Sequence, residues 1–135
     1  MTTPLKDLRG ASTSLVETLA TEGITDNEAF VQAAAAPDDR KSLAVRCACN
    51  VSTILELANR ADLARVKGVS GVYSDLLENA GVDTVKELAT RNPTNLQQKL
   101  VETNDAMQLT QRPPSATQVE DWIGQAKDLP KILSY

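Results

Sequence analysis

The chain contains two copies of one pattern, and this internal repeat restricts its possible folds more than any other feature. Residues 8–24, LRGASTSLVETLATEGI, align without gaps with residues 66–82, VKGVSGVYSDLLENAGV, at an offset of 58 residues. In each copy a glycine-containing turn precedes apolar residues at helical spacing, and a further glycine ends the run. Each copy therefore predicts a tight turn followed by an amphipathic helix.

The similarity between the two copies continues beyond these turns. Each copy next has residues suited to capping a helix, and then a proline able to start one, Pro37 or Pro93. Each closes on a further amphipathic helix, predicted to be capped by Ser52 in the first copy and by Ser115 in the second. We expect an all-α chain of about nine helices, including short ones. The tail from Pro130 to Tyr135 is expected to be loosely held.

The two copies define the expected domain organisation. The first repeat comprises residues 1–63 and the second residues 64–135, and no flexible Gly/Ser linker separates them. Repeats of this size are stabilised by packing on one another, so we expect one compact domain with pseudo-twofold character. With one Phe, one Trp and two Tyr, the core must be aliphatic and alanine-rich, and Trp122 is expected to lie in it.

The turn in the second copy resembles the helix-hairpin-helix motif, in which an apolar residue, a glycine, an apolar residue and a second glycine form the hairpin. Those places are held here by Val66, Gly68, Val69 and Ser70, so a serine replaces the second glycine. Serine can still cap the helix that follows. The runs from Glu56 to Leu96 and from Arg112 to Leu129 are similar to a widespread bacterial family of domains of unknown function built from such repeats. The resemblance implies two tandem helix-hairpin-helix repeats, similar to sterile-alpha-motif bundles.

The resemblance also implies a way of binding nucleic acid. In helix-hairpin-helix modules the hairpin N–H groups and the start of the following helix contact a phosphate without reading sequence, and paired hairpins can hold both strands. Lys6 and Arg60 would add positive charge beside the hairpins. The implied binding residues of this chain are Arg9, Gly10, Ser12, Arg65, Lys67, Gly68, Ser70 and Gly71.

The charge of the chain favours a different interpretation. The net charge is −4, with six basic and nine acidic residues up to Leu63 and eight and nine after it, whereas phosphate-binding domains usually have a basic balance. The alternative is a protein-interaction module, with a protein partner or a second copy bound and no nucleic acid. Candidate surfaces for this function are the side of the second hairpin helix with Tyr73 and Leu77, and the neighbourhood of Trp122.

Several functional classes are not expected. The chain has no histidine, no nucleophile with a base at a catalytic spacing and no phosphate-binding loop, so we expect no enzyme activity, cofactor or small-molecule substrate. Cys47 and Cys49 stand two positions apart, where helical side chains point about 200° from one another, so they cannot chelate one metal ion. No apolar run approaches a membrane span and Met1 to Lys6 has no signal pattern, so the expected location is the cytoplasm.

Overall fold

The computed structural model describes residues 2–69 and 71–135, and over these residues the chain is all-helical, as predicted. They contain eight α-helices, one 3-10 helix and no strand beyond an isolated antiparallel bridge between Pro4 and Asp26. In chain order the elements are η1 (Leu5–Asp7), α1 (Thr13–Ala20), α2 (Asn27–Ala33), α3 (Pro37–Arg46), α4 (Val51–Leu63), α5 (Gly71–Asn79), α6 (Val85–Ala89), α7 (Pro93–Met107) and α8 (Ala116–Asp128).

Glycines matched at the offset of 58 residues have the same backbone conformation. The φ angles are +86° at Gly10 and +95° at Gly68, and +79° at Gly23 and +95° at Gly81. Side chains other than glycine are strained in this region, so the glycines allow the turn before each helix and the stop after it. The start of α2 after Asp26 and of α6 after Thr84 follows the same offset, and both residues cap their helix with a side-chain oxygen.

The N-cap predicted at Ser115 is confirmed, and the one predicted at Ser52 is wrong. The Ser115 hydroxyl accepts the N–H of Gln118, whose side chain accepts the N–H of Ser115 in return. Helix α4 starts at Val51, and Asn50 occupies its N-cap position without a side-chain cap bond. The extended backbone of Asn50 (φ −78°, ψ 149°) directs the chain into the helix two residues earlier than expected.

The buried apolar side chains form two clusters. One is built mainly from η1 and α1–α4, and the other from α5–α8 and the end of α4, where Leu63 belongs to it. Trp122 is only 2% exposed, which confirms its predicted place in the core. Long helix α4 therefore has one face in the first cluster and its last residue in the second. The largest fully buried side chains are those of Leu5, Leu19, Phe30, Leu43, Ile54, Leu57, Leu63, Leu76, Leu77, Leu88, Leu100 and Trp122.

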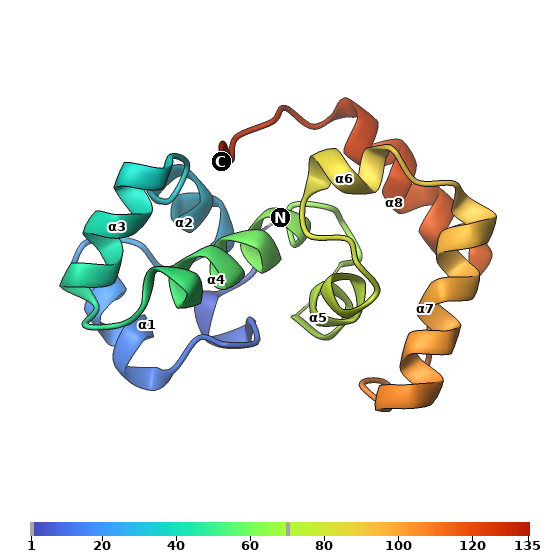
Figure 1. Cartoon of the computed structure of the whole chain (residues 1–135), viewed down its shortest axis with the longest axis horizontal. Coiled ribbons are helices and arrows are strands. Elements are labelled where there is room, and N and C mark those ends of the chain that lie inside the picture. The colour runs from blue at the N-terminus through green and yellow to red at the C-terminus, as the bar shows by residue number, and fades with distance from the viewer. Residues whose placement is uncertain (1, 70) are drawn as a thin grey trace.

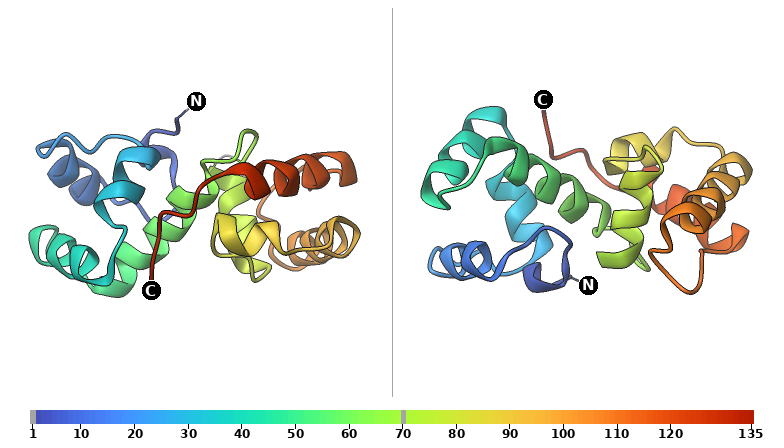
Figure 2. Two further views of the ribbon diagram at one scale, coloured as in Figure 1. Left: turned by 90° about the horizontal axis from the view of Figure 1, so that it is seen from above. Right: turned by 60° about the horizontal axis from the view of Figure 1, so that its bottom comes forward.

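Figure 1 shows the two groups of helices side by side, with α1–α3 on one side, α5–α8 on the other and α4 between them. Both views in Figure 2 show the same division. After α8 the chain continues as an extended segment across α4 to the first group. The expectation of a loose tail is therefore wrong, because Leu133 is buried in the first cluster and the Ser134 N–H donates to the carbonyl of Ala35 (2.8 Å).

Candidate nucleic-acid interface

The first hairpin is an exposed turn directly before α1. Leu8 anchors it in the core, and its carbonyl accepts the N–H of Ala11 (3.3 Å). The Ser12 hydroxyl accepts the N–H of Leu15 (3.2 Å) and so caps α1. Arg9, Gly10 and Ser12 are all exposed to solvent. These three predicted residues therefore lie together on the surface, at the N-terminal end of a helix.

The second hairpin has the same turn but is covered by α8. The turn closes with the N–H of Val69 donating to the carbonyl of Val66 (3.1 Å), and Gly68 follows Lys67 at its exposed corner. A β-carbon on Gly68 would lie 3.0 Å from Nε1 of Trp122, so the turn packs against the edge of the buried indole. Ser70, the predicted cap of the following helix, lies outside the described residues.

Gln125 of α8 binds the backbone of the second hairpin. Its Oε1 accepts the N–H of Lys67 (2.8 Å), and its Nε2 donates to the carbonyl of the same residue (3.1 Å). The Lys67 amide is thus already engaged, while its ammonium group is exposed. Sequence reasoning missed Gln125 because no motif relates a glutamine on the last helix to a turn 58 residues earlier.

Arg65, a predicted phosphate contact, belongs to an internal ion pair. Its Nη1 lies 2.8 Å from Oδ1 of Asp62, its Nη2 donates to the carbonyl of Pro130 (2.8 Å), and its side chain is 5% exposed. The other carboxylate oxygen of Asp62 accepts the N–H of Val85 at the start of α6 (2.8 Å). The guanidinium thus joins α4, α6 and the start of the tail, and is not presented to solvent at the hairpin.

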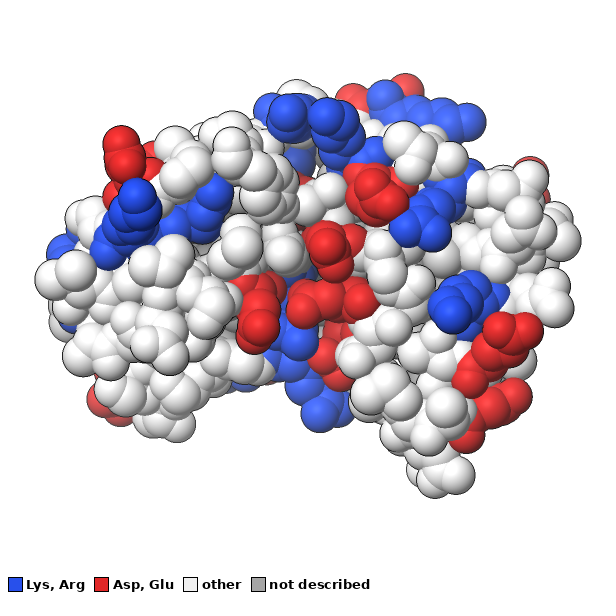
Figure 3. Space-filling model, in the orientation of Figure 1, with Lys and Arg blue, Asp and Glu red and all other residues white. Residues whose placement is uncertain are grey.

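Arg60 is also held inside the molecule, by acidic residues of α5. Its Nη2 lies 3.2 Å from Oδ1 of Asp75 and 3.4 Å from Oε1 of Glu78, and its other terminal nitrogen faces Gly10. Burial raises the pKa of Glu78, and Arg60 opposes that shift. Acidic side chains gather on the central face between the two helix groups in Figure 3. This face therefore repels phosphate.

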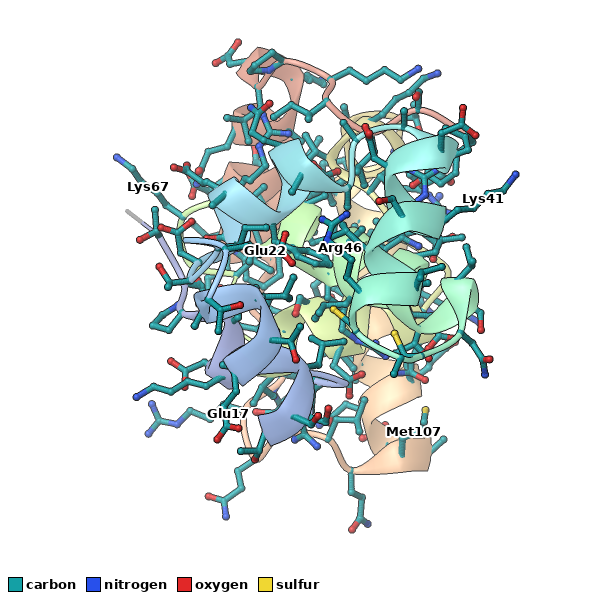
Figure 4. All side chains as sticks on the ribbon, turned by 90° about the vertical axis from the view of Figure 1, so that its left-hand side faces the viewer. Glu17, Glu22, Lys41, Arg46, Lys67 and Met107 are labelled. Carbon is teal, nitrogen blue, oxygen red and sulfur yellow. The ribbon has the colours of Figure 1, made fainter. Side chains whose placement is uncertain are left out.

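The start of α5 packs directly on the segment that leads into the first hairpin. A β-carbon on Gly71 would overlap the carbonyl oxygen of Asp7 and would lie 3.7 Å from the Cα atom of Leu8. Gly71 is therefore buried at a contact between the two halves of the chain. Because of this contact the two hairpins are neighbours, with the exposed residues Lys6, Arg9 and Lys67 around them. In Figure 4 Lys67 and Lys41 lie on opposite sides of the molecule, and each points outward.

The alternative surface on the second hairpin helix is not open. Leu77 is fully buried, and the ring of Tyr73 lies 5.3 Å from the ring of Trp122, centroid to centroid. The Tyr73 hydroxyl donates to the carbonyl of Arg112 (2.9 Å). These side chains hold α5 against α8 and the connection that precedes α8. The most exposed large apolar side chain of the described residues is instead Val45, at 81%, near the end of α3.

Within residues 2–69 and 71–135 no three His, Cys, Asp or Glu side chains are placed to hold a metal ion. In that part of the chain, no helix combines the length and apolar character needed to cross a bilayer. Cys47 and Cys49 are unpaired thiols, and partial burial raises the pKa of both, so the reactive thiolate is disfavoured.

Over the described residues these features define a small all-helical protein with two adjacent glycine turns, beside which Lys6, Arg9 and Lys67 are exposed. Residues 9–129 match the family described as "Domain of unknown function (DUF4332)", and the chain belongs to that family. The expected membership of a family of unknown function is confirmed. No curated protein and no solved structure matches the chain.

Proposed function

We propose that this chain is a non-catalytic binding module of two tandem helix-hairpin-helix repeats, residues 1–63 and 64–135, which contacts nucleic acid without reading its sequence. The observation that carries the proposal is the approach of Gly71 to Asp7, which makes the two hairpins neighbours. The exposed cations Lys6, Arg9 and Lys67 then lie around one surface, where they can neutralise phosphates.

In this proposal the two hairpins contribute unequally. The first offers the exposed turn at Gly10 and the N-terminus of α1, where backbone N–H groups and the helix dipole favour an anion. The second contributes the side chain of Lys67, since Gln125 engages its backbone and Gly71 is buried. The contact is therefore made mainly by the first repeat, and binding is weak.

The number of cations predicts the salt dependence. Three phosphates neutralised on duplex DNA give a slope of log K against log salt near −2.7, which means about a 40-fold loss of affinity between about 50 and 200 mM salt. Fluorescence anisotropy of a labelled duplex of about 20 base pairs measures this slope directly. Binding with a slope near zero would contradict a phosphate contact.

Charge reversal at the hairpins separates this site from general electrostatic attraction. Lys67→Glu and Arg9→Glu are expected to weaken duplex binding and to flatten the salt dependence by about one phosphate each. Lys41→Glu makes the same change of charge on the opposite side of the molecule and serves as the matched control (Figure 4). Equal effects of Lys41→Glu and Lys67→Glu would refute the hairpin surface as the binding site.

A protein-interaction module is the second candidate, and two observations favour it. The guanidinium groups of Arg60 and Arg65 are used in internal ion pairs, which leaves few cations for phosphates. Val45 and Val51 are 81% and 42% exposed on either side of the connection between α3 and α4, where a partner would bury them. Absence of duplex binding even at low salt, together with capture of a partner that Val45→Lys abolishes, would favour this candidate over the first.

A further inference from the structure

The tail after α8 belongs to the second half of the chain, but it binds to the first half. Leu133 is 3% exposed and lies in the first hydrophobic cluster, and Ile132 packs against the same cluster. The tail reaches this place as an extended segment that crosses α4 (Figures 1 and 2). Its leucine thus completes a core built by helices that precede it by more than half of the chain.

The first half recognises the tail through its backbone as well as through its side chains. The N–H of Ser134 donates to the carbonyl of Ala35 (2.8 Å), and the carbonyl of Ser134 accepts from Nη2 of Arg40 (2.7 Å). The Tyr135 hydroxyl donates to Oδ1 of Asn59 (2.7 Å). Leu133 thus occupies an apolar pocket, the backbone of Ser134 is hydrogen-bonded, and the Tyr135 hydroxyl is bound by a side chain. Extended peptides are commonly bound in this way, with main-chain hydrogen bonds beside side-chain pockets.

Arg40 makes this groove incomplete without an occupant. The residue is 4% exposed, and over residues 2–69 and 71–135 no carboxylate forms an ion pair with it. Its other hydrogen bonds go to the carbonyls of Ala34 and Ala35, and its guanidinium carbon lies 5.4 Å from the ring centroid of Tyr135. Loss of the tail would remove both the Ser134 carbonyl and the aromatic ring from a buried cation, which favours refilling of the groove.

The groove does not depend on which chain supplies the tail. The partners of Leu133, Ser134 and Tyr135 named above all lie in the first half, and the segment reaches them across α4. An identical segment of another molecule would make the same contacts, which is the condition for exchange of an element between copies. We propose that the groove formed by Ala34, Ala35, Arg40 and Asn59 is a docking site for the tail of a second copy of this chain.

The experiment supplies that tail as a free peptide. A fluorescently labelled peptide of residues 128–135, DLPKILSY, is titrated with the full chain and with its Leu133→Asp variant, whose own tail cannot fill the apolar seat. In the unchanged chain the attached tail competes at an effective concentration of about 1 mM, so for a peptide Kd of about 100 μM the apparent affinity falls about tenfold. We therefore expect at least tenfold tighter binding to the variant.

A second peptide and a second variant keep the result unambiguous. The peptide DLPKIDSY carries the same change from leucine to aspartate and is expected not to bind. If Leu133→Asp unfolds, as judged by circular dichroism, Ser134→Pro replaces it. Proline removes the N–H that donates to the Ala35 carbonyl and so weakens the hold on the attached tail, without changing the Leu133 side chain.

Three outcomes would overturn the proposal. They are equal binding of DLPKILSY and DLPKIDSY, equal affinity of the peptide for the full chain and a folded variant, and no binding to a folded variant. Unfolding of both variants would also overturn it, because the tail would then be an integral part of the fold and not a separable docking element.

Discussion

Replacement of Arg65 by methionine should destabilise the fold strongly, although its position beside the hairpin suggests a surface residue. Methionine keeps the apolar length of the side chain but removes the guanidinium that contacts Asp62 and the Pro130 carbonyl. The side chains of Arg65 and Asp62 are 5% and 4% exposed, so the Asp62 charge would be left in a place that water hardly reaches.

The expected size follows from these contacts. Removal of one partner from a buried ion pair costs about 3–5 kcal/mol. Asp62 would still accept the N–H of Val85, which favours the lower end, about 3 kcal/mol. For a domain with a typical total stability of about 5–15 kcal/mol, such a loss is easily measured.

Urea unfolding, followed by circular dichroism and by the fluorescence of the single tryptophan, Trp122, measures this change. The double variant Asp62→Asn with Arg65→Met should be less destabilised than the sum of the two single variants, by about 1 kcal/mol or more, because asparagine can still accept from Val85 and carries no charge. A cost below about 1 kcal/mol for Arg65→Met would refute the buried pair. A loss of duplex binding on charge reversal at Arg65 therefore reports on folding, and Lys67→Glu is the interpretable variant.

Two further predictions concern stability. Gly71→Ala should destabilise the protein by about 2 kcal/mol or more, because the added β-carbon would overlap the Asp7 carbonyl. Gly124→Ala, inside α8 where a β-carbon meets no neighbour, should stabilise it by about 0.5–1 kcal/mol. Urea midpoints of the two variants that move in the same direction would refute the close contact at Gly71. Because burial raises the pKa of Glu78 above its ordinary value of 4.5, ionisation of Glu78 opposes folding. The stability of Glu78→Gln relative to the unchanged chain should therefore rise as the pH increases from about 4.5 and level off above the folded-state pKa, and unfolding curves with no such divergence would contradict the assignment.

The sequence by itself determined the local conformation of this chain. The turns at Gly10 and Gly68, the cap at Ser115 and the burial of Trp122 on its apolar stripe each follow from residues within a few positions of one another. Backbone strain, capping and helical periodicity act over one or two turns of chain, so a single sequence contains the information. The predicted cap at Ser52 failed within the same range, because Asn50 was equally able to precede the helix.

The partners of the charged and tail residues were decided only by the tertiary structure. From the sequence, Arg65 is expected to be a cation beside a hairpin. It is buried because it pairs with Asp62, which accepts the N–H of Val85 at the start of α6, and because it donates to the Pro130 carbonyl of the tail. Gln125 binds a turn 58 residues away, and Ser134 is bound by residues 94 and 99 positions earlier. Such contacts depend on how whole helices pack, and packing brings together residues that share no local pattern. The repeat therefore predicts two glycine turns. The packing of α8 and the tail determines which of the groups at these turns reach solvent.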